Sequence, residues 1–332
     1  ADMEARVEDL LRQMTLEEKT CQLATLYGSG RILQDAQPTE QWKTKIWKDG
    51  IGNIDEELNG LGKFRSEYSF PYKKHVEAKH AVQRWFVEET RLGIPVDFTN
   101  EGIRGLCHDR ATYFPAQCGQ GATWNKELIA KIGEVTAREA KALGYTNIYS
   151  PILDIAQDPR WGRVVESYGE DPYLTSRLGV AVVNGLQGPD TARYNKLHAC
   201  AKHYAVHSGP EWNRHSFNAE NISPRDLWET YLPAFKTLVQ EAKVKEVMCA
   251  YNRFEGEPCC GSNRLLTQIL RDEWGFDGVV VSDCGAVSDF WQKRKHETHP
   301  DAASASADAV LNGTDVECGN SYKSLPDAVK AG

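Results

Sequence analysis

The residues of this chain that are best suited to chemistry follow short apolar runs. The run 278–281 leads into Asp283, and the segment around Cys200 leads into Lys202 and His203. A carboxylate in such a position can act as a nucleophile, although an aspartate there can also cap a helix. A lysine in an apolar setting needs a polar partner, so the alternative for Lys202 is a structural ion pair with a neighbouring carboxylate.

A second group of polar and aromatic residues follows other apolar runs. The block 158–163, Asp-Pro-Arg-Trp-Gly-Arg, contains Trp161 and Arg163, and two further runs end in Glu101 and Tyr251. Arginine can donate paired hydrogen bonds to vicinal hydroxyls, and an indole offers a flat apolar face that stacks on a sugar ring. The alternative for this block is a rigid loop held by salt bridges. Together with the residues above, the group has the composition of a polyol-binding site.

Sequence motifs and composition exclude several classes of ligand. The chain has no HExxH, no CxxC pair, no GxxxxGK and no GxGxxG after a strand, so we expect neither a metal nor a nucleotide cofactor. A net charge of −8, without a dense cluster of Lys and Arg, argues against a nucleic-acid partner. No apolar stretch reaches the length of a membrane span, and residues 1–20 lack the apolar centre of a signal peptide. A neutral or weakly polar small molecule fits best.

The elements that must position these residues alternate along the chain. Short β-branched runs alternate with amphipathic segments, a pattern typical of βαβ units around a parallel sheet. We expect eight strands, at residues 22–27, 50–54, 94–98, 147–153, 199–204, 246–251, 279–282 and 313–318. They predict an α/β fold, a (β/α)8 barrel of TIM type spanning residues 1–332 as one domain, ahead of an open doubly wound sheet. The chemical residues lie at the C-terminal strand ends, where barrels hold their functional groups.

Helix and loop signals support this alternation. Asp171, followed by a proline, predicts a helix over 173–186. Ser223, also followed by a proline, predicts a helix whose apolar face extends to Leu238. The stretch 56–74 is the most loop-like of the chain and is expected to be a loop at the barrel rim.

Taken in order, these motifs resemble glycoside hydrolase family 3 over nearly the whole chain. The matching motifs lie at residues 14–19, 158–163, 168–172, 202–203, 248–252 and 275–283. The resemblance implies a retaining, exo-acting β-glycosidase with Asp283 as the nucleophile that forms the glycosyl-enzyme. Such an enzyme needs a second carboxyl group as acid/base across the anomeric carbon, and cations near Asp283 would keep it ionised.

The resemblance also implies roles for the other residues at the strand ends. Arg163, Lys202 and His203 would hold hydroxyls of the sugar in the first subsite. Tyr251 would lie beside the nucleophile, and Glu101 would bind the far side of that sugar. The substrate would be an oligosaccharide with a terminal β-linked sugar.

Within the family, the resemblance favours a β-xylosidase of xylan degradation, with a β-glucosidase as the alternative. The β-glucosidases usually have Trp after the nucleophile and Asp at the position of Glu101, whereas this chain has Cys284 and a xylosidase-like segment 313–319. A longer carboxylate at position 101 would occupy the space of a hexose hydroxymethyl group and so favour a pentose. Residues 102–105 depart from the Ala-Leu-His-Gly of xylosidases, which bears on the choice of sugar and not on the glycosidase assignment.

The acid/base residue is not identified by the sequence. In most of the family it comes from a second α/β domain after the barrel, so we expect that the chain is a fragment of a longer enzyme or that a second polypeptide completes the site. Glu166, Glu211 and Glu257 are candidates from position alone. The loop 207–215 lacks the Asp-Ser-His dyad of the N-acetylhexosaminidase branch, which we exclude. An apolar flank covered by the missing domain or by a second copy in a homodimer is expected.

Two other classes of function remain to be tested. Lys202 could form a Schiff base, as in aldolase barrels, and a non-catalytic carbohydrate-binding role would explain the missing acid/base. The nine cysteines do not form the pattern of a disulfide-dense scaffold, and we expect a periplasmic or secreted location ahead of a cytoplasmic one. Trp212, Trp291 and Trp124 are candidates either for outer subsites or for the core.

Overall fold

The sheet at the centre of the molecule has seven parallel strands in chain order. The computed structural model describes residues 2–27, 33–34, 37–40, 48–55 and 71–332, so most of the expected rim loop 56–74 lies outside the described residues. The strands are β1 (Thr25–Tyr27), β4 (Asn53–Asp55), β5 (Asp97–Glu101), β6 (Asn147–Tyr149), β7 (His198–Tyr204), β9 (Glu246–Cys249) and β12 (Val279–Ser282).

The eighth expected strand closes this sheet, in a shorter form than predicted. Within 313–318, Val316 forms a parallel bridge with Val281 of β12, and Glu317 forms one with Ala24, just before β1. These two bridges join the first and last strands of the sheet. The predicted (β/α)8 barrel is confirmed, with its last strand reduced to single-residue pairs.

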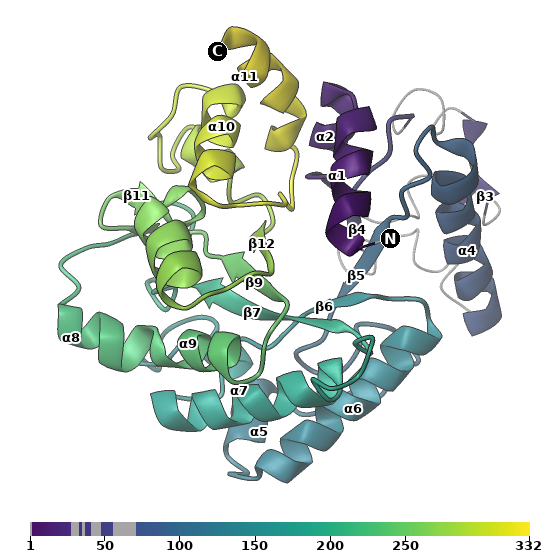
Figure 1. Cartoon of the computed structure of the whole chain (residues 1–332). Helices are drawn as coiled ribbons and strands as arrows, with labels where there is room; N and C mark the ends of the chain where they lie inside the picture. The colour runs from purple at the N-terminus through teal and green to yellow at the C-terminus, as the bar shows by residue number, and fades with distance from the viewer. Residues whose placement is uncertain (1, 28–32, 35–36, 41–47, 56–70) are drawn as a thin grey trace.

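Helices lie around the outside of this sheet (Figure 1). In chain order they are α1 (Met3–Gln13), α2 (Leu16–Cys21), α4 (Tyr72–Glu89), α5 (Gln117–Gly121), α6 (Lys126–Ala142), α7 (Pro172–Gln187), α8 (Pro224–Asp226), α9 (Pro233–Gln240), α10 (Ala302–Asn312) and α11 (Leu325–Ala331). A π-helix, Arg264–Glu273, connects β9 to β12. Five two-residue strands form two small additional sheets: β2 (Leu33–Gln34), β3 (Gln37–Pro38), β8 (Asn218–Ala219), β10 (Arg253–Phe254) and β11 (Glu257–Pro258).

The predicted start of α7 is confirmed, whereas the helix after Ser223 is not continuous. Asp171 accepts a hydrogen bond from the backbone N–H of Leu174 at 2.6 Å and so caps α7. After Ser223, the chain forms α8, then a π-helical turn at Leu227–Tyr231, and then α9, which begins at Pro233. Proline has no N–H to donate to the preceding turn, so a regular helix cannot pass through this residue.

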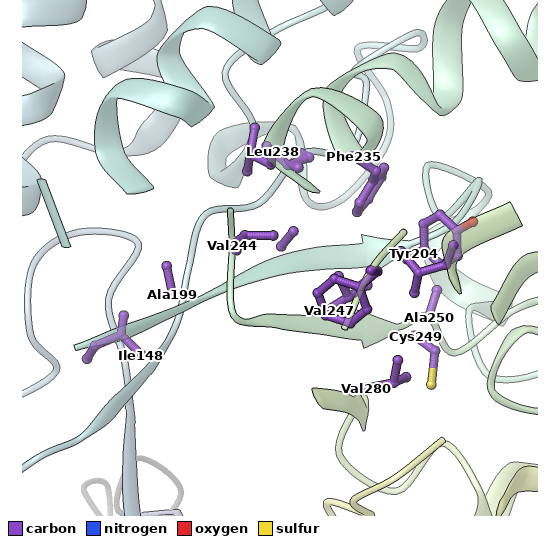
Figure 2. Close-up of a cluster of buried hydrophobic side chains, with 14 of the residues drawn as sticks. Ile148, Ala199, Tyr204, Phe235, Leu238, Val244, Val247, Cys249, Ala250 and Val280 are labelled. Atoms are coloured by element: carbon purple, nitrogen blue, oxygen red, sulfur yellow. The ribbon is translucent and has the colours of Figure 1, made fainter. Parts of the chain in front are cut away.

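The outer face of the sheet packs against these helices in a continuous apolar core. Figure 2 shows one part of it, in which Phe235 and Leu238 of α9 lie over Val247 of β9 and Ala199 of β7. All four side chains are at most 2% exposed. The core therefore holds β7 and β9 rigidly, and these strands lead into the predicted site.

Cysteines contribute two disulfides to this frame. Cys249, at the end of β9, pairs with Cys260, and Cys284 pairs with Cys318. The second bridge joins the residue after Asp283 to the segment that closes the barrel. Within the described part of the chain, no helix combines the length and apolarity needed to cross a membrane.

Candidate active site

Asp283 lies immediately after β12, at the C-terminal end of the barrel, as predicted. Its Oδ1 accepts a hydrogen bond from the backbone N–H of Cys284 at 2.8 Å. Its Oδ2 accepts none from any described residue, although Asp283 is only 7% exposed. No helix of the described structure begins at this residue, since the next one is the short 3-10 turn Ser288–Phe290. The helix-cap interpretation therefore fails, and a buried carboxylate oxygen is left available for chemistry.

Lys202, on β7, forms an ion pair with Glu101 at the end of β5. Their side chains are 4% and 17% exposed, respectively. Burial opposes the charge on Lys202 and is the largest single effect, but the Glu101 and Asp283 carboxylates together raise the pKa of the lysine. Lys202 is thus an ammonium group held in place. This argues against a Schiff-base role, which needs a neutral amine.

His203 is fixed by a partner that the sequence interpretation missed. Asp154, which follows β6, lies 2.7 Å from His203 Nδ1 through its Oδ2. This contact fixes the orientation of the imidazole ring, with Nε2 on the side of Asp283. Burial lowers the pKa of His203 well below its ordinary value and raises the pKa of Asp154 to about 7. The available signal was a carboxylate directly after the apolar run 147–153.

Strand alternation predicts that only one of Lys202 and His203 faces the site, and this prediction is wrong. Both side chains reach it, because His203 Nε2 lies 3.6 Å from Asp283 Oδ2 while Lys202 contacts Glu101. The pairing of β7 with β9 shifts register between Ala201 and Tyr204. Regular alternation requires an unbroken ladder, so it does not hold across this irregularity.

Arg163 completes the cationic side of the site. Its Nε and Nη2 donate to the two carboxylate oxygens of Glu166 at 2.8 and 2.7 Å, and Nη1 lies 3.4 Å from His203 Nε2. Burial opposes the charge of Arg163, but Glu166 and Asp283 together raise its pKa. Burial likewise opposes ionisation of Glu166, yet Arg163 lowers its pKa overall. Glu166 is therefore a paired anion that holds the arginine.

The pKa of Asp283 is set by burial and by nearby cations, and the balance of these effects differs from the prediction that the cations would dominate. Arg163 and Lys202 are both near enough to favour its charged form, as predicted. Burial acts in the opposite direction and is the larger effect, so the pKa of Asp283 is raised above its ordinary value. The cations thus limit the rise without cancelling it.

The two predicted aromatic residues take different positions. The Tyr251 hydroxyl donates to the backbone carbonyl of Cys284 at 2.7 Å and so lies beside Asp283, in the predicted position. Trp161 is only 5% exposed, and its ring lies edge-on to His207, with 6.5 Å between ring centroids. The indole therefore forms a wall one side chain away from His203, instead of an open platform in the first subsite.

Six of the seven predicted site residues thus meet around one point at the barrel mouth. They are Glu101, Arg163, Lys202, His203, Tyr251 and Asp283, and we refer to them below as the inner ring. Cations, a neutral imidazole and carboxylates arranged in this way can hold several hydroxyl groups of one small polyol while Asp283 faces it. Glu101 also borders a cavity of about 490 Å³ that extends along residues 103–113.

None of the three candidate acid/base carboxylates has contacts that identify it as the general acid. Glu166 is held by Arg163, and Glu211 forms an ion pair with Arg214. Glu257 is exposed on β11. A general acid must reach the oxygen of the departing group, and no contact of these three residues connects them to Asp283 in that way.

Known proteins resemble this chain over most of its length. The profile of the glycosyl hydrolase family 3 N-terminal domain matches residues 15–332. A xylan 1,4-β-xylosidase of Xylanibacter ruminicola is 53% identical over 261 residues, which are 73% of this chain and 30% of the relative. A putative β-xylosidase of Formosa agariphila is 33% identical over 99% of this chain and 43% of the relative. A solved β-glucosidase structure from Erythrobacter marinus matches with a TM-score of 0.87 at 29% identity, over 98% of this chain and 42% of that chain. The chain therefore spans less than half the length of each of these proteins.

Proposed function

The chain belongs to glycosyl hydrolase family 3, and from this premise we propose that it is a retaining, exo-acting β-glycosidase that removes terminal β-linked xylose from oligosaccharides. The observation that carries the proposal is the free Oδ2 of Asp283, buried within the inner ring. A carboxylate whose other oxygen is held by a backbone N–H, as Oδ1 is by that of Cys284, can present its second oxygen to an electrophilic carbon.

The chemistry follows from this geometry. Asp283 Oδ2 forms a bond to the anomeric carbon of the terminal sugar while the bond from that carbon to the leaving oxygen breaks, and a proton goes to the leaving oxygen. Water then attacks the same carbon, gives up a proton and releases Asp283 as a carboxylate. Arg163 and Lys202 hold hydroxyls of the sugar and reduce the cost of the buried charge, while Asp154 keeps the His203 ring in one orientation.

The preference for xylose is supported by Glu101. Its carboxylate is held by Lys202, and because glutamate is longer than aspartate, it would leave less room for the hydroxymethyl group of a hexose. The xylosidase names of the two relatives above support the same sugar. A β-glucosidase is the second candidate, because the solved relative from Erythrobacter marinus carries that name and covers 98% of this chain.

The acid/base group is proposed to come from outside the barrel. The absence of a suitably placed carboxylate among the described residues, and the greater length of the relatives, support a further domain or a second polypeptide as its source. A periplasmic or secreted location is also proposed, and the two disulfides support it because such bonds persist in oxidising compartments.

The test uses a substrate that needs no acid. The chain is incubated with 2,4-dinitrophenyl 2-deoxy-2-fluoro-xyloside or with the matching glucoside, and the labelled peptide is identified by mass spectrometry. We expect label on the peptide containing Asp283, with the xyloside reacting faster. Borohydride with a carbonyl substrate provides the comparison for a Schiff base at Lys202. Sugar binding without any label, in folded protein, would favour the non-catalytic alternative.

A further inference from the structure

Tyr251 is the member of the inner ring whose hydroxyl lies beside the nucleophile. The hydroxyl donates to the backbone carbonyl of Cys284 at 2.7 Å. It is also close enough to the Asp283 carboxylate to favour the charged form of that group. A tyrosine side chain can rotate about two bonds, so the position of its hydroxyl depends on what holds the backbone and the ring.

The backbone of Tyr251 is held by His296. Nε2 of His296 lies 2.7 Å from the carbonyl oxygen of Tyr251. A carbonyl oxygen can only accept a hydrogen bond, so Nε2 is the donor in this contact. His296 is 6% exposed, and its backbone N–H donates to the carbonyl of Asp289 at 2.9 Å. The segment that follows the nucleophile therefore fixes the backbone of Tyr251 through this imidazole.

The ring of Tyr251 is contacted by a second imidazole. His215, in the loop between β7 and β8, lies edge-on to it, with 4.4 Å between ring centroids. The guanidinium of Arg214 lies over the same ring, 5.9 Å from its centroid. Edge-on contact is a favoured arrangement of two rings, so it stabilises one orientation of the tyrosine. The side chain of His215 is 40% exposed, so another group must keep this imidazole in place.

Asp289 is that group, and it connects the two imidazoles. Its Oδ2 lies 2.7 Å from Nδ1 of His215, and its side chain is only 5% exposed. Its Oδ1 lies 3.6 Å from Nζ of Lys295, and its backbone carbonyl accepts the hydrogen bond from His296. A buried carboxylate is unfavourable unless it is paired, and these contacts provide the pairing. One aspartate therefore orients both of the groups that hold Tyr251.

We propose that Asp289 and His215 form a positioning dyad that acts through Tyr251 and keeps its hydroxyl beside the carboxylate of Asp283. The inference rests on the proposed function, because it concerns how the nucleophile of that reaction is held. Neither residue of the dyad has to touch the sugar in this role. Without the dyad, the tyrosine ring can take other orientations, in which its hydroxyl no longer favours the ionised form of Asp283 that attacks.

The test measures labelling by 2,4-dinitrophenyl 2-deoxy-2-fluoro-xyloside and separates binding of the reagent from the rate constant for forming the covalent bond. His215→Ala and Asp289→Ala should each lower this rate constant roughly tenfold and change binding by less than about twofold. His215→Phe keeps a ring beside Tyr251 and should recover part of the loss. Asp308→Ala is the matched control and should behave as wild type. It removes the partner of His299, at 3.4 Å, and that imidazole contacts Phe290.

A double variant distinguishes positioning from general damage to the fold. Tyr251→Phe has no hydroxyl to position, so adding His215→Ala to it should slow labelling by less than about twofold further. Fluorine NMR of the chain containing 3-fluorotyrosine gives a readout that needs no reaction. The Tyr251 signal is assigned by its loss in Tyr251→Phe. It should shift in His215→Ala and Asp289→Ala and stay in place in Asp308→Ala.

Other outcomes would overturn the proposal. It fails if His215→Ala is labelled at the wild-type rate, or if this substitution slows labelling by the same factor with and without the Tyr251 hydroxyl. It also fails if the fluorine signal of Tyr251 does not move. The His215 variants decide the matter if Asp289→Ala does not fold. Absence of labelling in the wild-type chain would contradict the glycosidase proposal, while the fluorine signal would still decide whether the dyad holds Tyr251.

Discussion

The inner ring and the cavity lined by Asp158, Arg160, Trp161 and residues 208–212, called the outer cavity below, differ in how their polar side chains are paired. In the inner ring, side chains are held by partners: Lys202 pairs with Glu101 inside the ring, and His203 pairs with Asp154, which lies outside it. In the outer cavity, Trp161 and Glu211 keep unpaired polar atoms, and Trp212 is almost fully exposed. Protein-protein pairs fix positions before a ligand arrives, as catalysis requires. Trp161 Nε1–H and Glu211 Oε2 are not fixed by such pairs among the described residues.

The largest effect should come from Asp283, whose Oδ2 accepts no hydrogen bond from the described residues. Asp283→Ala should lower the rate of release of dinitrophenol from 2,4-dinitrophenyl xyloside by roughly 10⁴-fold or more, because the covalent route is lost. Added azide should restore part of this rate by occupying the vacated space, and should yield an α-linked glycosyl azide. Asp272→Asn, at an exposed carboxylate of the π-helix, should keep the wild-type rate. A folded Asp283→Ala variant with unchanged activity would remove the nucleophile assignment.

Removing one partner of the Lys202–Glu101 ion pair tests whether this pair holds the inner ring in place. Lys202→Met should lower the free energy of unfolding by about 3 kcal/mol, because it removes the buried cation that pairs with the Glu101 carboxylate. The double variant Lys202→Met/Glu101→Met should lose less than the two single variants combined, as measured by urea denaturation. Lys73→Met, which breaks an exposed pair with Glu77 on α4, should change stability by less than about 0.5 kcal/mol. Equal losses at the two lysines would mean that the ring is not held by its ion pairs.

The pH dependence of labelling tests how burial and the nearby cations set the pKa of Asp283. Asp283 must be ionised to attack, and burial raises its pKa, so the labelling rate should fall with decreasing pH at a value above the ordinary range of aspartate. Arg163→Gln removes a cation that favours the charged form, and so should move this fall to still higher pH. Arg163→Lys keeps the charge and should shift it less. An unchanged profile in Arg163→Gln would show that the arginine does not act on the nucleophile.

The smallest effect is expected at the rim of the outer cavity. Arg160 pairs only with Asp158, and its side chain is 88% exposed. Arg160→Ala should therefore change the free energy of unfolding by no more than about 0.5 kcal/mol. It should also leave the labelling rate of Asp283 at the wild-type value, measured by the time course of intact-protein mass. A large loss of labelling would mean that the rim and the inner ring are coupled and cannot be treated as separate regions.

Local patterns in the sequence were sufficient for much of the fold and for the membership of the site. The apolar runs predicted the strands, and Asp171 predicted the start of α7, because both signals depend on residues that are neighbours in the chain. The residues after those runs meet at one end of the barrel because parallel strands share a C-terminal edge. The sequence by itself therefore determined the barrel and six members of the inner ring.

Tertiary structure alone decided how those residues act on one another. Glu101 and Lys202 are 101 positions apart in the chain, and Asp154 and His203 are 49 apart, so no local pattern pairs them. The pKa of Asp283 is raised because several strand ends bury its carboxylate. Lys202 and His203 both face the site at a point where the pairing of β7 with β9 shifts register. Residue types and spacing determine which groups reach the barrel mouth, whereas charge pairing and burial depend on distances that exist only once the barrel has closed.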